Sequence, residues 1–212
     1  MLRRKTPIFV WGIVYMLFAF MSYNEALNST KEIQDAFLIF AQSLSSPQKL
    51  FFDVSIFFTI YLFILKKPFT EPMFVSRCKE KYLQYIIFFG VKICIGYLLY
   101  TIMLYLGIPI ILGAKLSVNT ALVLVIIRLF SVIFTLYLIY IIMLIKSNNQ
   151  TLSIVSGCVL NIVLLLLLAV SYIFNYNLGK SLESAILIFY PWVSAIMVSV
   201  IFYEYKHKEF LL

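Results

Sequence analysis

Long apolar stretches dominate this sequence and set the strongest limit on how it can fold. An α-helix needs about 20 mostly apolar residues to cross the hydrocarbon core of a bilayer, with a range of roughly 17 to 25. Six stretches meet or approach this length, and polar segments separate them. They cover approximately residues 7–23, 50–65, 83–107, 119–145, 151–174 and 184–205. The sequence therefore predicts an all-α integral membrane protein with six transmembrane helices in a single domain, residues 1–212.

The composition is unsuited to a water-facing surface. Hydrophobic residues make up 63% of the chain and charged residues only 12%. Soluble domains are usually nearer half apolar and a quarter charged. Lipid is the solvent in which such a chain can expose its side chains, so we expect membrane lipid to be one of its partners.

Lysine and arginine are unevenly distributed between the two sets of loops. Of the 17 basic residues, eleven fall on one side, four fall on the other, and two lie inside spans. The eleven are Arg3, Arg4, Lys5, Lys66, Lys67, Arg77, Lys79, Lys81, Lys146, Lys206 and Lys208. The four on the other side are Lys31, Lys49, Lys115 and Lys180. The two inside spans are Lys92 and Arg128. Cytoplasmic loops carry the basic excess. We therefore predict a plasma-membrane protein with both termini in the cytoplasm. Nucleic-acid binding is disfavoured, because it needs basic residues clustered on a water-facing surface.

The segment between the first two spans, residues 30–46, has a helical pattern of its own. Ile33, Phe37, Phe40 and Leu44 follow one another at steps of four, three and four residues, which places them on one helical face. We predict a short amphipathic helix that lies in the outer interface of the membrane. A disordered loop is the alternative.

The segment between the second and third spans also predicts a short helix, over about residues 70–82. Thr70 is a suitable N-cap and Pro72 suits the first turn. The cations towards its end match the helix dipole; they are Arg77, Lys79 and Lys81. Such a helix would lie parallel to the membrane on the cytoplasmic side. An ordinary basic loop is the alternative.

The spans lack the groups that catalysis inside a membrane requires, namely a nucleophile, an acid–base pair or a metal site. The sequence contains no His-Glu-x-x-His, no Gly-x-Ser-x-Gly and no phosphate-binding loop, and its one histidine, His207, follows the last apolar stretch. We therefore expect this chain not to be an enzyme and to bind neither a metal nor a cofactor of its own.

One charged residue lies well inside the fourth span. Arg128 is about nine residues from the start of that stretch, and a cation at the centre of a span costs at least ~2.5–3.5 kcal/mol on insertion scales. Ser131 and Thr135 fall on the same helical face, and Asp53 is the candidate counter-ion. Arg128 is therefore interpreted either as lining a substrate pathway or as part of a buried ion pair.

Lys92 occupies a comparable position in the third span, reckoned from the inner side. Gly96 and Tyr100 follow it at four-residue steps, so its helical face is partly small and partly polar. Lys92 either lines a substrate pathway or extends its ammonium group towards the membrane surface.

The fifth span carries Ser153, Gly157 and Asn161 at four-residue steps. Small and polar residues on one stripe allow helices to approach closely and to form hydrogen bonds between them. Helix packing is the favoured interpretation of this stripe, and a substrate contact is the alternative.

Residues 71–83 resemble the coupling-helix region of small bacterial ABC exporter permeases. In that family, one or two apolar residues precede a Ser-Arg pair and further basic residues, and an aromatic residue stands where the third span begins. The corresponding residues here are Met73, Phe74, Val75, Ser76, Arg77, Lys79, Lys81 and Tyr82. The plan of six spans, the short polar turn between spans four and five, and the charged C-terminal tail are similar too.

This resemblance implies a permease of the type-2 class. Two permease subunits, identical or paralogous, would form the export pathway, and separate ABC ATPase subunits would bind ATP and Mg²⁺. The residues implied at the ATPase contact are Ser76, Arg77, Lys79 and Lys81. The family also implies an amphipathic or antimicrobial-type peptide as substrate. The alternative is a non-transporting membrane protein, such as a bacteriocin immunity or assembly factor.

Overall fold

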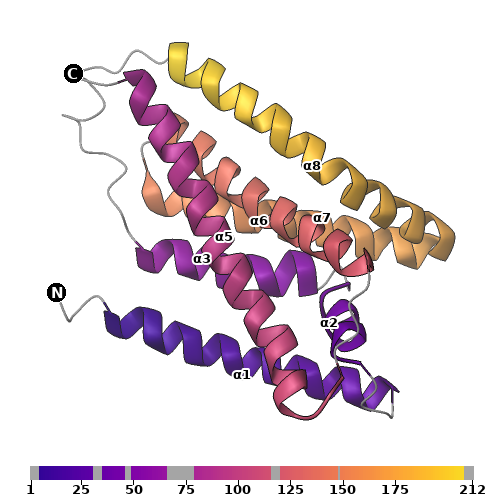
Figure 1. Ribbon diagram of the computed structural model, residues 1–212. Helices are drawn as coiled ribbons and strands as arrows, with labels where there is room; N and C mark the ends of the chain where they lie inside the picture. Colours follow the sequence, from indigo (N-terminus) through magenta and orange to yellow (C-terminus); the bar gives the residue numbers. More distant parts are fainter. Residues whose placement is uncertain are drawn as a thin grey trace.

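The computed structural model describes residues 5–30, 35–45, 49–65, 79–115, 120–147 and 149–207. Within these ranges 96% of the residues are helical and no β-strand occurs; a single bridge joins Asp35 to Lys115. The prediction of an all-α protein is confirmed. The helices are α1 (Lys5–Thr30), α2 (Ala36–Ser45), the π-helix η2 (Lys49–Asp53), α3 (Val54–Leu65), α5 (Lys79–Ile111), α6 (Thr120–Ser147), α7 (Gln150–Phe174) and α8 (Tyr176–His207) (Figure 1).

Five of the described helices are long and apolar enough to cross a membrane. Their apolar stretches are Pro7–Ala26 in α1, Gln84–Ile111 in α5, Leu122–Ser147 in α6, Thr151–Phe174 in α7 and Tyr176–Glu204 in α8. The predicted bounds hold to within a few residues for α6 and α7. By contrast α1 continues past residue 23 to Thr30, α5 extends beyond both of its predicted ends, and α8 begins at Tyr176 instead of residue 184. In α1 and α8 the helical backbone extends through polar residues that lie outside the apolar run.

The predicted second span, residues 50–65, folds differently from the other five. Its first residues belong to η2, and regular helix begins only at Val54 and ends at Leu65, 12 residues later. At 1.5 Å per residue, α3 is about 18 Å long, which is short of the ~30 Å hydrocarbon core. The described residues therefore establish five candidate spans, where the sequence predicted six.

Within the predicted outer helix, residues 30–46, the structure describes α2. Phe37, Phe40 and Leu44 all lie on its buried face, so the amphipathic pattern is confirmed over residues 36–45, while Ile33 falls outside the described residues. Protein covers this face, because α2 packs against α1, α5 and η2. The position of α2 at the outer membrane surface stays a prediction, but the apolar face formed by these three side chains packs on protein and is not left to lipid.

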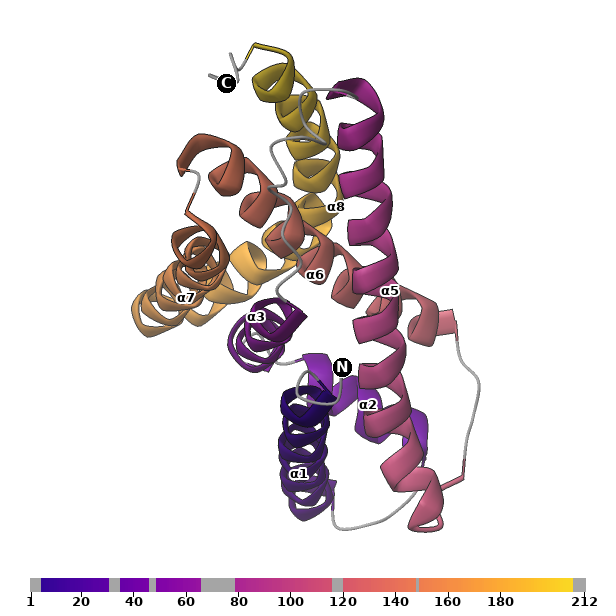
Figure 2. The same cartoon turned by 90° about the vertical axis from the view of Figure 1, so that its left-hand side faces the viewer.

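Successive long helices run back and forth through the molecule. One end of the bundle lies towards the left of Figure 1; α1, α5 and α7 begin there, and α3, α6 and α8 end there. We call it the basic end, because the chain segments that precede and follow these helices are rich in lysine and arginine. Figure 2 looks onto this end, with α3 and α7 pointing towards the viewer and α5 crossing the view. The helices therefore cross at large angles.

α5 and α6 approach each other closely at Gly90. A Cβ atom on Gly90 would lie 1.8 Å from the Tyr137 ring, so only a glycine leaves room for that ring. The Tyr137 side chain is fully buried, and its hydroxyl donates to the carbonyl oxygen of Ile86 over 2.9 Å. Gly90 thus fixes how closely α6 packs against α5.

Candidate functional site

One apolar recess beside the candidate spans is an open groove between α1 and α5, with one side chain from α3. It holds about 500 Å³. We call it the aromatic groove, and its lining residues are Ile8, Phe9, Trp11, Gly12, Ile13, Met16, Tyr61, Gly96, Tyr97 and Tyr100. A recess of this size is in the range of small-molecule and cofactor sites, which are mostly apolar and carry few polar groups.

The polar atoms of the groove's aromatic residues are largely occupied within the protein. Trp11 Nε1 donates to the carbonyl oxygen of Phe57 over 3.1 Å, and the Tyr97 hydroxyl donates to the carbonyl oxygen of Val54 over 3.0 Å. The Tyr100 hydroxyl donates to the carbonyl oxygen of Gly12 in α1 over 2.8 Å. Buried Tyr and Trp side chains usually find such partners. The groove therefore presents mainly ring surfaces, which suit an apolar chain better than a polar ligand.

These rings also hold α1 in place. The Trp11 ring lies 5.0–6.0 Å, centroid to centroid, from four tyrosine rings, which are those of Tyr15, Tyr61, Tyr97 and Tyr100. Tyr15 is fully buried, and its hydroxyl shares a 3.1 Å hydrogen bond with the hydroxyl of Thr101. Aromatic pairs at these separations contribute about 0.5–1.5 kcal/mol each beyond the area that they bury.

Two glycines set the width of the aromatic groove. A Cβ atom on Gly12 would lie 3.1 Å from the Tyr100 hydroxyl, so α1 and α5 meet closely there. A Cβ atom on Gly96 would meet nothing within 4 Å. The space in front of Gly96 is therefore open, and a larger side chain at this position would extend into the groove without a clash.

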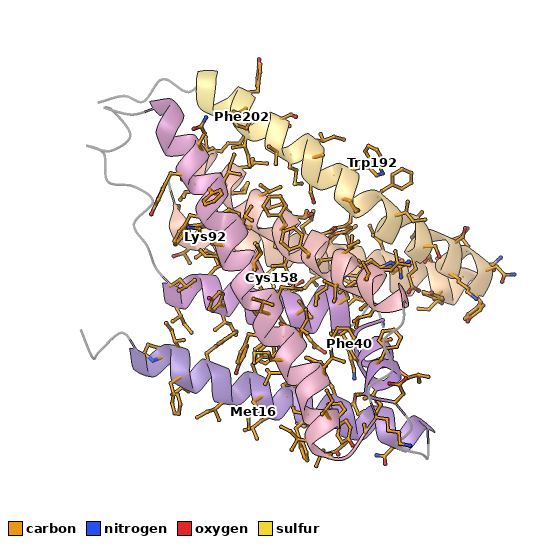
Figure 3. All side chains as sticks on the ribbon, in the orientation of Figure 1. Met16, Phe40, Lys92, Cys158, Trp192 and Phe202 are labelled. Carbon is orange, nitrogen blue, oxygen red and sulfur yellow. The ribbon has the colours of Figure 1, made fainter. Side chains whose placement is uncertain are left out.

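Lys92, Gly96 and Tyr100 share one face of α5, as their spacing predicts, but only the last two line the aromatic groove. Lys92 lies one turn nearer the start of α5, outside that lining, and its side chain is exposed. Figure 3 shows Lys92 on the flank of α5 that is nearer the basic end. Its ammonium group lies 4.9 Å from the centroid of the Phe88 ring, which is within the range of a cation–π contact.

Arg128 differs in burial from the two polar residues of its predicted stripe. Ser131 and Thr135 are buried, and Thr135 shares a 2.7 Å hydrogen bond with Ser194 of α8. The side chain of Arg128 is exposed, and within the described part of the chain it forms no ion pair. The structure therefore gives no support to the pairing of Arg128 with Asp53.

Asp53 lies among other charges, at the opposite end of the bundle from the basic end. The charged groups that act on its carboxylate are the Lys49 ammonium and the Glu25 carboxylate. Lys49 itself forms a 2.8 Å ion pair with Glu25. This cluster joins the last turns of α1 to η2.

The stripe of Ser153, Gly157 and Asn161 faces the inside of the bundle, and all three residues are buried. Ser153 donates to the carbonyl oxygen of Asn149 over 2.6 Å, in the turn between α6 and α7. A Cβ atom on Gly157 would lie 3.2 Å from the side chain of Leu136, so α7 approaches α6 closely here.

Asn161 joins three helices. Its side-chain amide donates to the hydroxyl of Ser55 in α3 over 2.7 Å and accepts from the hydroxyl of Tyr190 in α8 over 2.7 Å. The hydroxyl of Ser194, one turn further along α8, donates to the carbonyl oxygen of Tyr190 over 3.1 Å. We call Ser55, Asn161, Tyr190, Ser194 and Thr135 the polar seam. Sequence reasoning missed Ser55 and Tyr190, because a single serine or tyrosine in an apolar run carries no periodic signal.

Only part of the predicted coupling segment is described. Ser76 and Arg77, with the rest of residues 66–78, lie outside the described residues. Lys79 and Lys81 belong to the first turn of α5, which begins at Lys79. Within the described ranges, no three His, Cys, Asp or Glu side chains are grouped so that they could hold a metal ion.

The sequence also gave no indication of the aromatic groove. Trp11 comes from α1, Tyr61 from α3 and Tyr97 from α5, so the groove depends on how three distant segments pack. Comparison with known proteins adds no further identification: no protein-family model matches the chain, and no curated protein or solved structure matches it significantly.

Proposed function

We propose that this chain is the membrane-spanning subunit of an ATP-driven exporter in the plasma membrane, with six spans and both termini in the cytoplasm. A second permease subunit would complete the pathway, and separate ATPase subunits would bind ATP and Mg²⁺. The observation that carries the proposal is the basic segment of residues 66–82, which resembles an ATPase-coupling region and joins α3 to α5.

The course of the chain supports the six-span arrangement. α3 ends and α5 begins at the basic end of the bundle, where α1 also begins and α8 also ends (Figure 1). This course is consistent with residues 66–78 lying on the same side of the membrane as both termini, the arrangement that the distribution of basic residues favours.

The shortness of the second span is compatible with this arrangement. α3 alone is about 18 Å long, and the π-helix η2 directly precedes it. Val54, Phe57, Phe58 and Leu62 are buried, so protein covers much of α3. A short span is tolerated where neighbouring helices cover it or where the bilayer thins locally.

The basic segment is tested by reversing its charge. We expect Arg77→Glu combined with Lys79→Glu to abolish co-purification of the ATPase encoded by the neighbouring reading frame, because two acidic side chains would replace the cations at the contact. ATP hydrolysis stimulated by the complex should fall to the level of the isolated ATPase. Both quantities can be measured on the complex purified in detergent.

The matched control is Lys115→Glu combined with Lys180→Glu. Both lysines are exposed and lie on the predicted outer side, so this variant makes the same change in net charge and should retain the ATPase. Full ATPase binding and activity in the Arg77→Glu, Lys79→Glu variant would refute the coupling assignment. If the neighbouring genes encode no ATPase and none co-purifies, the immunity or assembly role is favoured instead.

A further inference from the structure

The aromatic groove opens on a surface that belongs to the membrane-embedded part of the chain. Both of its main walls, α1 and α5, are candidate spans. Large apolar side chains of its lining are exposed, among them Phe9, Ile13 and Met16. Acyl chains of lipids would surround these residues in a bilayer, whichever end of the bundle faces the cytoplasm.

The chemistry of the groove walls suits a hydrocarbon chain. The indole nitrogen of Trp11 and the hydroxyls of Tyr97 and Tyr100 are already bonded to backbone carbonyl oxygens, so they offer little to a polar ligand. The open space in front of Gly96 lets a chain lie against α5. Filling about 500 Å³ with apolar atoms gains dispersion contacts with these rings.

A cation stands close to one end of the groove. Lys92 precedes Gly96 by four residues on the same face of α5, so the two positions are about 6 Å apart along the helix axis. The Lys92 side chain is exposed, and its ammonium group contacts the uncharged ring of Phe88. Among the described residues it has no carboxylate within ion-pair distance.

We propose that the aromatic groove binds an acyl chain of an anionic phospholipid whose phosphate group contacts Lys92. A phospholipid carries an anion at one end of a long apolar chain, and the protein presents a cation beside one end of an apolar groove. An anionic lipid is favoured over a zwitterionic lipid, because the cation of a zwitterionic headgroup competes with Lys92 for the phosphate. This proposal does not depend on the transport function.

The test uses the fluorescence of Trp11, which bromine atoms on a bound acyl chain quench. The chain has two tryptophans, and Trp192 is exposed on α8, so Trp192→Phe leaves Trp11 as the reporter. The protein is reconstituted in vesicles of phosphatidylglycerol and phosphatidylcholine, with bromine on the chains of either lipid in turn. We expect brominated phosphatidylglycerol to compete for the groove about five-fold more effectively, the factor expected from one lysine near an anionic surface.

Substitutions at two positions test the contribution of the charge and that of the groove separately. Lys92→Gln should remove the preference for phosphatidylglycerol, and Lys92→Arg should keep it. Gly96→Leu should reduce quenching by both lipids, because the leucine side chain occupies the groove. The control for Gly96→Leu is Gly107→Leu, since a Cβ atom at Gly107 also meets nothing within 4 Å and Gly107 does not line the groove. The control for Lys92→Gln is Lys180→Gln on α8.

Equal quenching by the two brominated lipids would contradict selection of an anionic headgroup, and so would a preference that survives in Lys92→Gln. No quenching by either lipid would mean that something other than an acyl chain fills the groove, such as a second copy of the chain or a peptide. Inorganic phosphate should leave the quenching unchanged, and if it displaced the brominated lipid, the site would bind phosphate without needing the acyl chain.

Discussion

Gly90→Ala should destabilise the protein by at least about 3 kcal/mol, the upper end of the usual cost of overpacking. The added methyl group would be placed 1.8 Å from the ring of Tyr137. That ring is fully buried and its hydroxyl is bonded to the Ile86 carbonyl, so it cannot turn away without losing the bond. Either α6 must separate from α5 or the tyrosine must leave the interface. Unfolding of the purified protein by a denaturing detergent measures the loss.

The effect of Gly90→Ala should depend on Tyr137. In a Tyr137→Ala background the clash is absent, so adding Gly90→Ala should cost nothing further; this coupling is what a double-mutant cycle measures. Gly107→Ala, on the same helix but with open space at its Cβ position, should leave stability unchanged or raise it by up to ~1 kcal/mol. An equal cost of Gly90→Ala with and without the tyrosine ring would refute the close packing of α6 on α5.

Asn161→Leu should destabilise the protein by about 1–3 kcal/mol. It keeps the approximate volume of the side chain but removes both hydrogen bonds, to Ser55 and from Tyr190. Hydrogen bonds between membrane helices contribute about 0.6 kcal/mol on average and up to ~1.7 kcal/mol, and the two hydroxyls left behind are buried without this partner. The same unfolding measurement detects the loss.

The losses of stability caused by Asn161→Leu and by Tyr190→Phe should not be additive. Tyr190→Phe removes one of the two hydrogen bonds and should cost about half as much, and it should cost almost nothing when added to Asn161→Leu. Ser199→Ala is the control, because Ser199 is exposed and bonds only within its own helix. Independent, additive costs of Asn161→Leu and Tyr190→Phe would contradict the polar seam.

The helices that could be predicted from the sequence are those with a continuous apolar run. α6 and α7 match their predicted bounds closely, because the polar residues around Asn149 end one run and cap the next helix: the Asn149 side chain accepts from the backbone N–H of Leu152 over 3.2 Å. Residues 50–65 were harder to assign, because hydropathy alone does not distinguish regular α-helix from the π-helical turn η2.

Long-range packing accounts for what could not be predicted. The periodicity of α2 identified its buried face but could not indicate whether lipid or protein covers it. The aromatic groove requires Trp11, Tyr61 and Tyr97 to meet, and they lie on three separate helices. Arg128, Ser131 and Thr135 share a helical stripe, yet only the last two are buried, and the hydroxyl of Thr135 contacts Ser194 of α8.

The six-span arrangement and the ATPase contact both require the basic segment, residues 66–82, to lie in the cytoplasm. Measuring on which side of the membrane this segment lies therefore tests both at once. The chain has three cysteines, Cys78, Cys94 and Cys158. Replacing Cys94 and Cys158 with alanine leaves Cys78 in this segment. A maleimide that cannot cross membranes, added to intact cells, should leave Cys78 unlabelled and should label it only after the membrane is permeabilised.

The comparison residue for this measurement is Asn177. It is exposed at the start of α8, beyond the opposite end of the bundle, so Asn177→Cys in a cysteine-free background should be labelled in intact cells. If the membrane is crossed only by the five long helices and not by residues 50–65, the segment that follows α3 would lie on the opposite side from the N-terminus. Labelling of Cys78 in intact cells, with Asn177→Cys protected, would contradict the account.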